Sequence, residues 1–210
     1  MDKKIISYFD NIAHNWDELR KCYFPDELKT RVTEGMVKDK DIIAADIGTG
    51  TGFIALELAK VLYSVIAIDV SSEMLKMAQK KAEKEGLKNL LFIKGKMQDI
   101  PLMDGSVDLV FTNMALHHVD DPLKGIQEMH RILKPGGVIT IIDVEKHEFE
   151  WAREEMCDVW LGFDRKEIAE WMQIVGFKNI SVEFSGYSAR AVSKKGSKAE
   201  VGIFIAKGVK

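Results

Sequence analysis

Between residues 41 and 145 the sequence alternates short apolar runs with longer stretches of helical periodicity. The apolar runs predict five strands, at 42–47, 65–68, 90–93, 107–111 and 138–142. Apolar residues recur at helical spacing between them, which predicts helices at 53–62, 71–86 and 123–133. Strands that are apolar throughout and separated by helices are typical of a parallel sheet covered on both faces. The pattern therefore predicts an open α/β sheet.

The two ends of the chain depart from this alternation. The first 38 residues have helical periodicity, and another helix is predicted to begin at Asp164. Two last strands are predicted at 178–184 and 201–206, joined by a polar loop from Gly186 to Ala199. A direct strand–loop–strand connection favours an antiparallel hairpin. Together these features predict a seven-stranded, mostly parallel sheet with one reversed strand.

Composition narrows the class of protein further. The 210 residues contain no internal repeat or linker, so we expect a single domain. A formal charge of −3 and a pI near 6.0 argue against a nucleic-acid partner, because such proteins usually have a basic face. No apolar run approaches the ~18 residues of a membrane span. The two cysteines, Cys22 and Cys157, form no disulfide framework, which favours a reduced, cytoplasmic protein.

A glycine-rich turn follows the first predicted strand, with the sequence Asp46-Ile47-Gly48-Thr49-Gly50-Thr51-Gly52. Glycines at alternate positions let the backbone turn sharply and approach a ligand without obstruction by a Cβ atom. The carboxyl end of the strands is also where open α/β sheets bind ligands. A dinucleotide is one ligand of such turns, but its fingerprint requires glycine where this chain has Phe53.

Two carboxylates near this turn indicate the kind of ligand. Asp46 directly precedes the glycines, where a negative charge would repel a pyrophosphate and attract a cationic amino-acid moiety. Asp69 ends the second predicted strand, and a carboxylate there can accept bonds from both hydroxyls of a ribose. A helix cap is the alternative role for Asp69, although Ser71 and Ser72 already supply that cap.

Six segments in order give the chain its resemblance to a known family. They are the glycine-rich turn, Asp69, Gln98-Asp99-Ile100-Pro101, Ser106-Val107-Asp108-Leu109-Val110, Ala115-Leu116-His117-His118 and Leu133-Lys134-Pro135-Gly136-Gly137. Together they resemble the class I S-adenosylmethionine-dependent methyltransferases of the small-molecule type. Within that class the chain resembles the branch of the menaquinone and ubiquinone C-methyltransferases, which the N-terminal Tyr8-Phe9-Asp10-Asn11-Ile12-Ala13 also matches. The likeness covers residues 5 to 145 well.

The resemblance implies a Rossmann-like fold with strand order 3-2-1-4-5-7-6, strand 7 being antiparallel. It implies three parts: a helical lid at 1–38, a cofactor-binding core at 39–145, and an acceptor-side segment with the terminal hairpin at 146–210. The implied cofactor is S-adenosylmethionine. Its implied contacts are Asp46, Gly48, Thr49, Gly50, Gly52, Asp69, Val70, Met74, Met97, Gln98 and Asn113, with Tyr8 and Trp16 from the lid.

Methyl transfer from a sulfonium is an in-line displacement, which an enzyme accelerates mainly by aligning the two reactants. A base is needed only where the acceptor must lose a proton. His117 and His118 follow the fourth strand and are candidates for that base, while packing and loop shaping are their alternative role. No metal is assigned, because adding Asp143 or His147 to this pair matches no recognised ligand spacing.

The acceptor is expected to be a small molecule methylated at C, O, N or S. The aromatic stretch 149–163 would form either the wall of its pocket or a dimer surface, and we expect a monomer or a homodimer. Cys22 and Cys157 raise methylation of a thiol-bound metalloid as an alternative, although that chemistry usually needs three thiols. Two other readings are a cofactor-binding sensor or partner protein without turnover, and a nicotinamide-dependent oxidoreductase.

Overall fold

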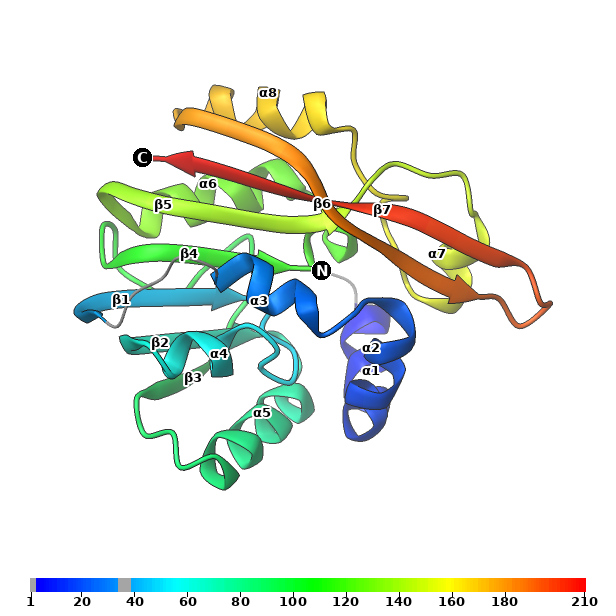
Figure 1. Ribbon diagram of the computed structural model, residues 1–210, viewed down its shortest axis with the longest axis horizontal. Coiled ribbons are helices and arrows are strands. Elements are labelled where there is room, and N and C mark those ends of the chain that lie inside the picture. The colour runs from blue at the N-terminus through cyan, green and yellow to red at the C-terminus, as the bar shows by residue number, and fades with distance from the viewer. Residues whose placement is uncertain (1–2, 34–38) are drawn as a thin grey trace.

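The fold is built on one seven-stranded sheet in the computed structural model, which describes residues 3–33 and 39–210. The strand order is β3-β2-β1-β4-β5-β7-β6, and β7 runs antiparallel to both of its neighbours (Figure 1). The strands are β1 (Asp39–Ile47), β2 (Leu62–Asp69), β3 (Leu90–Lys94), β4 (Val107–Asn113), β5 (Leu133–Val144), β6 (Lys178–Val192) and β7 (Lys198–Val209). The predicted fold class, strand order and reversed strand are confirmed.

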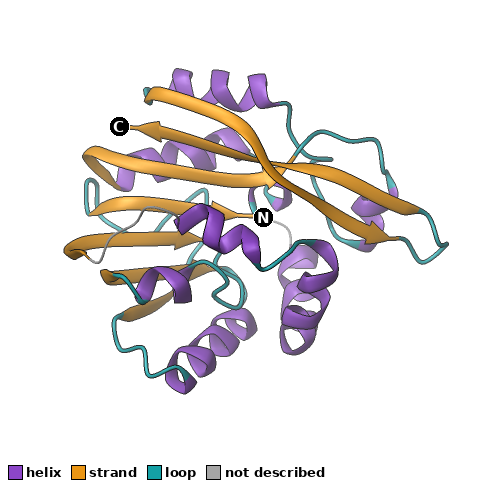
Figure 2. Ribbon diagram, in the orientation of Figure 1, coloured by secondary structure: helices purple, strands orange, loops and turns teal. Residues whose placement is uncertain are grey.

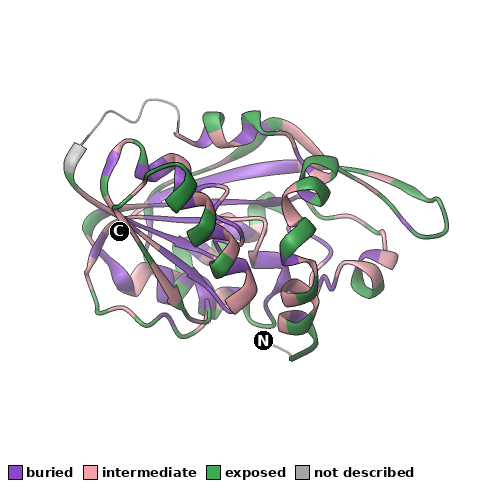
Figure 3. Cartoon of the chain, turned by 90° about the horizontal axis from the view of Figure 1, so that it is seen from below, coloured by how far each residue is buried: buried purple, intermediate pink, exposed green. Residues whose placement is uncertain are grey.

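Helices cover both faces of this sheet (Figure 2). They are α1 (Lys3–Ile12), α2 (Trp16–Tyr23), α3 (Glu27–Thr33), α4 (Ala55–Ala59), α5 (Ser72–Lys84), α6 (Pro122–Ile132), α7 (Trp151–Glu155) and α8 (Arg165–Val175), with short 3-10 turns η1 (Ala13–Asn15) and η2 (Leu116–His118). Successive side chains of a strand point to opposite faces. Ala45 and Ile47 of β1 therefore pack into the cluster beneath α6 and α8, and Ala44 packs into the cluster beneath α3 and α4. The centre of the sheet is deeply buried (Figure 3), whereas the edge strands β3 and β6 are mostly half-buried or exposed.

The terminal hairpin is longer than the sequence predicts. The predicted polar loop from Gly186 to Ala199 is wrong, because β6 continues to Val192 and β7 already begins at Lys198. Its polar residues lie on strands that extend past the rest of the sheet, and Arg190 forms an ion pair of 2.9 Å with its cross-strand partner Glu200. The actual turn is short and is closed by a 2.8 Å bond from the Ser193 N–H to the Ser197 carbonyl. The polar residues of these solvent-facing strands thus give a sequence pattern that is typical of a loop.

Candidate active site

The glycine-rich turn lies where β1 ends, and its geometry requires glycine. Gly48, Gly50 and Gly52 have φ angles of +73°, +55° and +86°, which residues with a side chain rarely adopt. A Cβ atom added to Gly48 would lie 2.5 Å from the Cβ of Ala115. The turn is also tied to β2, because the Gly48 N–H donates to the Ile68 carbonyl at 2.8 Å. The backbone is therefore held open towards the carboxyl ends of β1 and β4.

Asp46 supports this turn from behind. Its side chain is buried, and Oδ2 accepts hydrogen bonds from the Thr49 hydroxyl at 2.7 Å and the Ala55 N–H at 3.1 Å. Its other oxygen, Oδ1, is buried without a hydrogen-bond partner. Burial raises the pKa of Asp46 to about 7, against the two hydrogen bonds, which lower it. A cationic group of a ligand would relieve this cost.

Asp69 joins the same turn to the end of β2. Its Oδ2 accepts from the Gly50 N–H and its Oδ1 accepts from the Ser71 N–H, both at 2.8 Å. Burial raises the pKa of Asp69, and these backbone hydrogen bonds oppose that rise. A carboxylate has about four acceptor positions, so two remain after these bonds.

A cavity of about 730 Å³ opens in front of the turn. Its lining includes nine of the residues predicted to contact the cofactor: Trp16, Gly48, Thr49, Gly50, Asp69, Val70, Met74, Met97 and Asn113. The predicted Asp46, Gly52, Gln98 and Tyr8 do not line it. Gly52 faces Leu56 and Ala78, and Gln98 is hydrogen-bonded to Asp120 near the surface. On α1 it is Phe9, the neighbour of Tyr8, that lines the cavity.

The N-terminal helices form one wall of this cavity, including residues that the sequence reasoning missed. Trp16 and Arg20 line it from one side of α2, four residues apart, and Phe24 lines it from the extended residue directly after the helix. That spacing was the available signal for Arg20 and Phe24. The buried Arg20 guanidinium lies 4.2 Å from the centroid of the Phe53 ring, another lining residue, and is paired with Asp26.

Two aspartates attach this wall to the core. Asp17 accepts a bond from the Thr51 hydroxyl at 2.7 Å and lies 3.0 Å from the Lys81 ammonium. Asp10 accepts a bond of 2.5 Å from the Ser71 hydroxyl. Helices α1 and α2 are thus anchored across the mouth of the cavity, next to the turn and to the start of α5.

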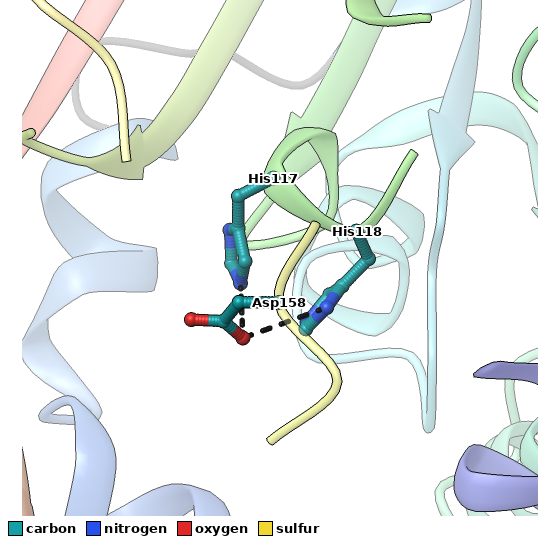
Figure 4. Close-up of side chains that lie close together, drawn as sticks. All are labelled: His117, His118 and Asp158. Carbon is teal, nitrogen blue, oxygen red and sulfur yellow. Dashed lines mark ion pairs between the residues drawn. The ribbon is translucent and has the colours of Figure 1, made fainter. Parts of the chain in front are cut away.

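Buried polar side chains gather beyond the end of β4, around η2. His117 Nδ1 lies 2.5 Å from Asp143 Oδ1, and Asp143 Oδ2 accepts from the Leu116 N–H at 3.0 Å. Burial alone would lower the pKa of His117, but the charge and hydrogen bond of Asp143 outweigh it and raise this pKa to about 9. The other ring nitrogen, Nε2, lies 3.8 Å from Oδ1 of Asp158 (Figure 4). Burial raises the pKa of Asp158 to about 6, although His117 lowers it.

His118 differs from its neighbour in charge. Burial and the proximity of His117 hold the pKa of His118 well below its ordinary value, so its ring is neutral. Its Nδ1 lies 3.2 Å from the Cys157 carbonyl oxygen. The two predicted histidines therefore lie in one cluster but differ in charge at neutral pH, His117 being protonated and His118 neutral.

A second cavity, of about 610 Å³, adjoins the first. The two share Trp16, Phe24, Met114 and His118 as lining residues. Aromatic residues of the 149–163 segment and small residues of the hairpin form its walls, including Phe149, Trp151, Ala189, Ala191, Ala199 and Val201. Its polar lining residues include His117, His118, His147 and Asp158, together with Tyr23 and Arg190, and neither cysteine lines it. The site therefore consists of two connected compartments.

Comparison with known proteins identifies the class. A family model described as a methyltransferase domain matches residues 45–141. The demethylmenaquinone methyltransferase of Staphylococcus carnosus is 26% identical, over 88% of this chain and 89% of that protein. The 2-methyl-6-phytyl-1,4-hydroquinone methyltransferase of Spinacia oleracea is 31% identical over 85% of this chain, which matches 50% of that longer protein. A solved S-adenosylmethionine-dependent methyltransferase from Aquifex aeolicus superposes with a TM-score of 0.66 at 26% identity, over 92% of this chain and 97% of that one.

The fold, the glycine-rich turn and these likenesses define a class I S-adenosylmethionine-dependent methyltransferase. Within that class the chain is similar to demethylmenaquinone methyltransferases. Its cofactor is S-adenosylmethionine, and two observations fit that group: the unpartnered Oδ1 of Asp46, and the glycine-rich backbone of Gly48 and Gly50 that lines the first cavity. No helix within the described residues, 3–33 and 39–210, is long and apolar enough to cross a membrane.

Proposed function

We propose that this chain methylates a ring carbon of a hydroquinone-type small molecule held in the second cavity. The observation that supports it most is the shape of the site. A compartment with aromatic and aliphatic walls and one polar end shares His118 with the cofactor compartment. A flat aromatic acceptor fits such walls, and its hydroxyl would face the polar end. The names of the relatives agree, because they specify demethylmenaquinone and a phytyl-hydroquinone.

The first cavity would hold the cofactor through the turn and β2. Gly48, Thr49 and Gly50 would lie against its methionine portion, and Asp69 would accept the two ribose hydroxyls through its remaining acceptor positions. The unpartnered Oδ1 of Asp46 would attract the positively charged amino group of the cofactor's methionine portion. When bound, the cofactor supplies a methyl group activated by a positive sulfur.

The polar end of the second cavity would prepare the acceptor. A hydroquinone becomes nucleophilic at the ring carbon beside a hydroxyl once that hydroxyl loses its proton. Asp158 is suited to take the proton, because a pKa of about 6 leaves it mostly ionised yet basic at neutral pH. The His117 imidazolium, held by Asp143, would stabilise the phenolate oxygen that forms. After the new carbon–carbon bond has replaced the methyl–sulfur bond, the ring carbon releases its own proton to solvent, and Asp158 returns its proton to the phenolate oxygen.

The proposal gives a role to each of the three predicted parts of the chain. Of the predicted lid at 1–38, residues 1–2 and 34–38 lie outside the described residues; the described part, 3–33, would cover the cofactor, and 39–145 would bind it. Residues 146–210 would enclose the acceptor, because α7 and the hairpin wall the second cavity. We expect the protein to act on this small molecule in the cytoplasm.

An acceptor panel with labelled S-adenosylmethionine tests the proposal. We expect label to reach reduced naphthoquinols and benzoquinols, and not alkyl thiols, arsenite or amines. Ala199→Trp would fill the second cavity and abolish transfer while S-adenosylhomocysteine still binds. Lys198→Trp on the neighbouring, exposed position is the matched control. Transfer to a thiol or to arsenite instead would refute the acceptor class, and cofactor binding with no acceptor methylated would favour a sensor or partner protein.

A further inference from the structure

We propose that His117, His118 and Asp158 form a binding site for one divalent transition-metal ion. One ligand atom from each residue lies within 4.8 Å of the other two, and all three side chains are buried (Figure 4). Oδ1 of Asp158 is 3.8 Å from His117 Nε2 and 3.7 Å from His118 Nδ1. These gaps are too long for hydrogen bonds. Ligand atoms around a tetrahedral zinc ion are separated by about 3.4 Å, from bonds of about 2.0–2.2 Å, so the two distances to Asp158 need only a small contraction around an ion.

Asp158 provides an independent observation. Only 8% of the Asp158 surface is exposed, and its Oδ1 atom has no hydrogen-bond partner. A buried carboxylate oxygen without a donor is costly unless a positive charge compensates it. The His117 imidazolium compensates this oxygen only from 3.8 Å, whereas an ion bound between Asp158 and the two imidazoles would contact it directly.

The two histidines are oriented for ligation. Asp143 holds Nδ1 of His117 at 2.5 Å, which directs Nε2 towards Asp158. Metal-bound histidines usually have such a carboxylate on the opposite ring nitrogen. The Nδ1 atom of His118 faces the same oxygen of Asp158, at 3.7 Å. Ligation through its Nδ1 would replace the contact with the Cys157 carbonyl oxygen.

The backbone holds this arrangement without help from the three side chains. Cys157 adopts a φ of +61°, an uncommon conformation for a residue with a side chain, directly before Asp158. The N–H groups of Val159 and Trp160 both donate to the His117 carbonyl at 3.0 Å. The segment that contains Asp158 is therefore fastened to η2, and the site is preformed.

The donor set indicates the class of ion. Two imidazole nitrogens and one carboxylate oxygen suit Zn²⁺, Co²⁺ or Fe²⁺ better than Mg²⁺ or Ca²⁺. A bound ion would place its positive charge beside the second cavity, which His117, His118 and Asp158 line. The ion would then replace the proposed roles of Asp158 and the His117 imidazolium by binding the acceptor oxygen at an open coordination position; only this last role rests on the proposed function.

Co²⁺ titration of the metal-free, full-length protein tests the site, read by visible absorption of the ion and by displacement with Zn²⁺. We expect one ion per chain. Asp158→Asn should weaken Co²⁺ affinity at least about tenfold, and Asp143→Asn should weaken it by about 10–100-fold. The Asn variant of Asp158 breaks no hydrogen bond of Oδ1, so it should fold. His14→Ala, at an exposed histidine, is the control and should leave the affinity unchanged.

Absence of Co²⁺ absorption in the wild type, or equal affinity in the wild type and Asp158→Asn, would overturn the metal site. Methyl transfer by metal-free protein would then leave the proposed function standing. One bound ion that Asp158→Asn releases, in a protein that methylates no quinol, would support the metal site and refute the acceptor.

Discussion

Asp69 gives the sharpest prediction for cofactor affinity. Its two oxygens already accept the Gly50 and Ser71 N–H groups, which leaves two acceptor positions for the ribose hydroxyls. A hydrogen bond to a charged group contributes about 1.5–3 kcal/mol. Two such bonds at the lower value give about 3 kcal/mol, and about 1.4 kcal/mol corresponds to tenfold in Kd. Asp69→Ala should therefore raise the Kd for S-adenosylhomocysteine by at least about 100-fold.

Isothermal titration calorimetry with S-adenosylhomocysteine measures this change. Asp69→Asn keeps one acceptor oxygen, so it should lose about half of the free energy and weaken binding about tenfold. Circular dichroism and Tm must show that both variants remain folded, because Asp69→Ala also removes the acceptor of the buried Ser71 N–H. A folded Asp69→Ala variant whose Kd changes by less than about threefold would refute the ribose role.

Three further perturbations test the turn, the lid and the buried carboxylate. Gly48→Ala should abolish S-adenosylhomocysteine binding in calorimetry and lower Tm, because the added Cβ would collide with Ala115. Gly186→Ala is the control for backbone strain alone, because Gly186 has a φ of +90° and an added Cβ there would meet no atom within 4 Å. Asp17→Ala should speed S-adenosylhomocysteine dissociation in stopped-flow fluorescence by releasing the wall from the core; an unchanged rate would contradict the lid. Asp46 has a folded pKa of about 7, above its unfolded value of about 3.9, so the cofactor-free protein should lose stability as pH rises through that window. Urea unfolding should show a flatter pH dependence in Asp46→Asn, and identical profiles would contradict the raised pKa.

The sequence predicts the sheet well because its central strands are continuous apolar runs. Ala44, Ala45 and Ile47 serve both faces, so the parallel, doubly covered arrangement follows from β1 itself. The ends of β6 and β7 were missed because their exposed, alternating residues lack that apolar signal. Local polarity there does not distinguish a loop from strands that extend past the sheet.

The cofactor site was more predictable than the acceptor site for the same physical reason. Gly48, Gly50 and Asp69 come from one turn and the adjoining strand end, so short-range motifs reveal them. Asp143 and Asp158 are brought to His117 from β5 and from the loop after α7, far along the chain. No local spacing encodes that convergence, and only the fold reveals the cluster. The contacts assigned to individual residues remain predictions.

The most direct test of the account is the destination of the methyl group. The protein would be incubated with S-adenosylmethionine ¹³C-labelled in its methyl group and with demethylmenaquinol under reducing conditions, and the product examined by NMR. The account predicts a labelled methyl on the quinol ring carbon, formed by the wild type and lost in Ala199→Trp. Label on an oxygen, or equal transfer when the second cavity is filled, would contradict it.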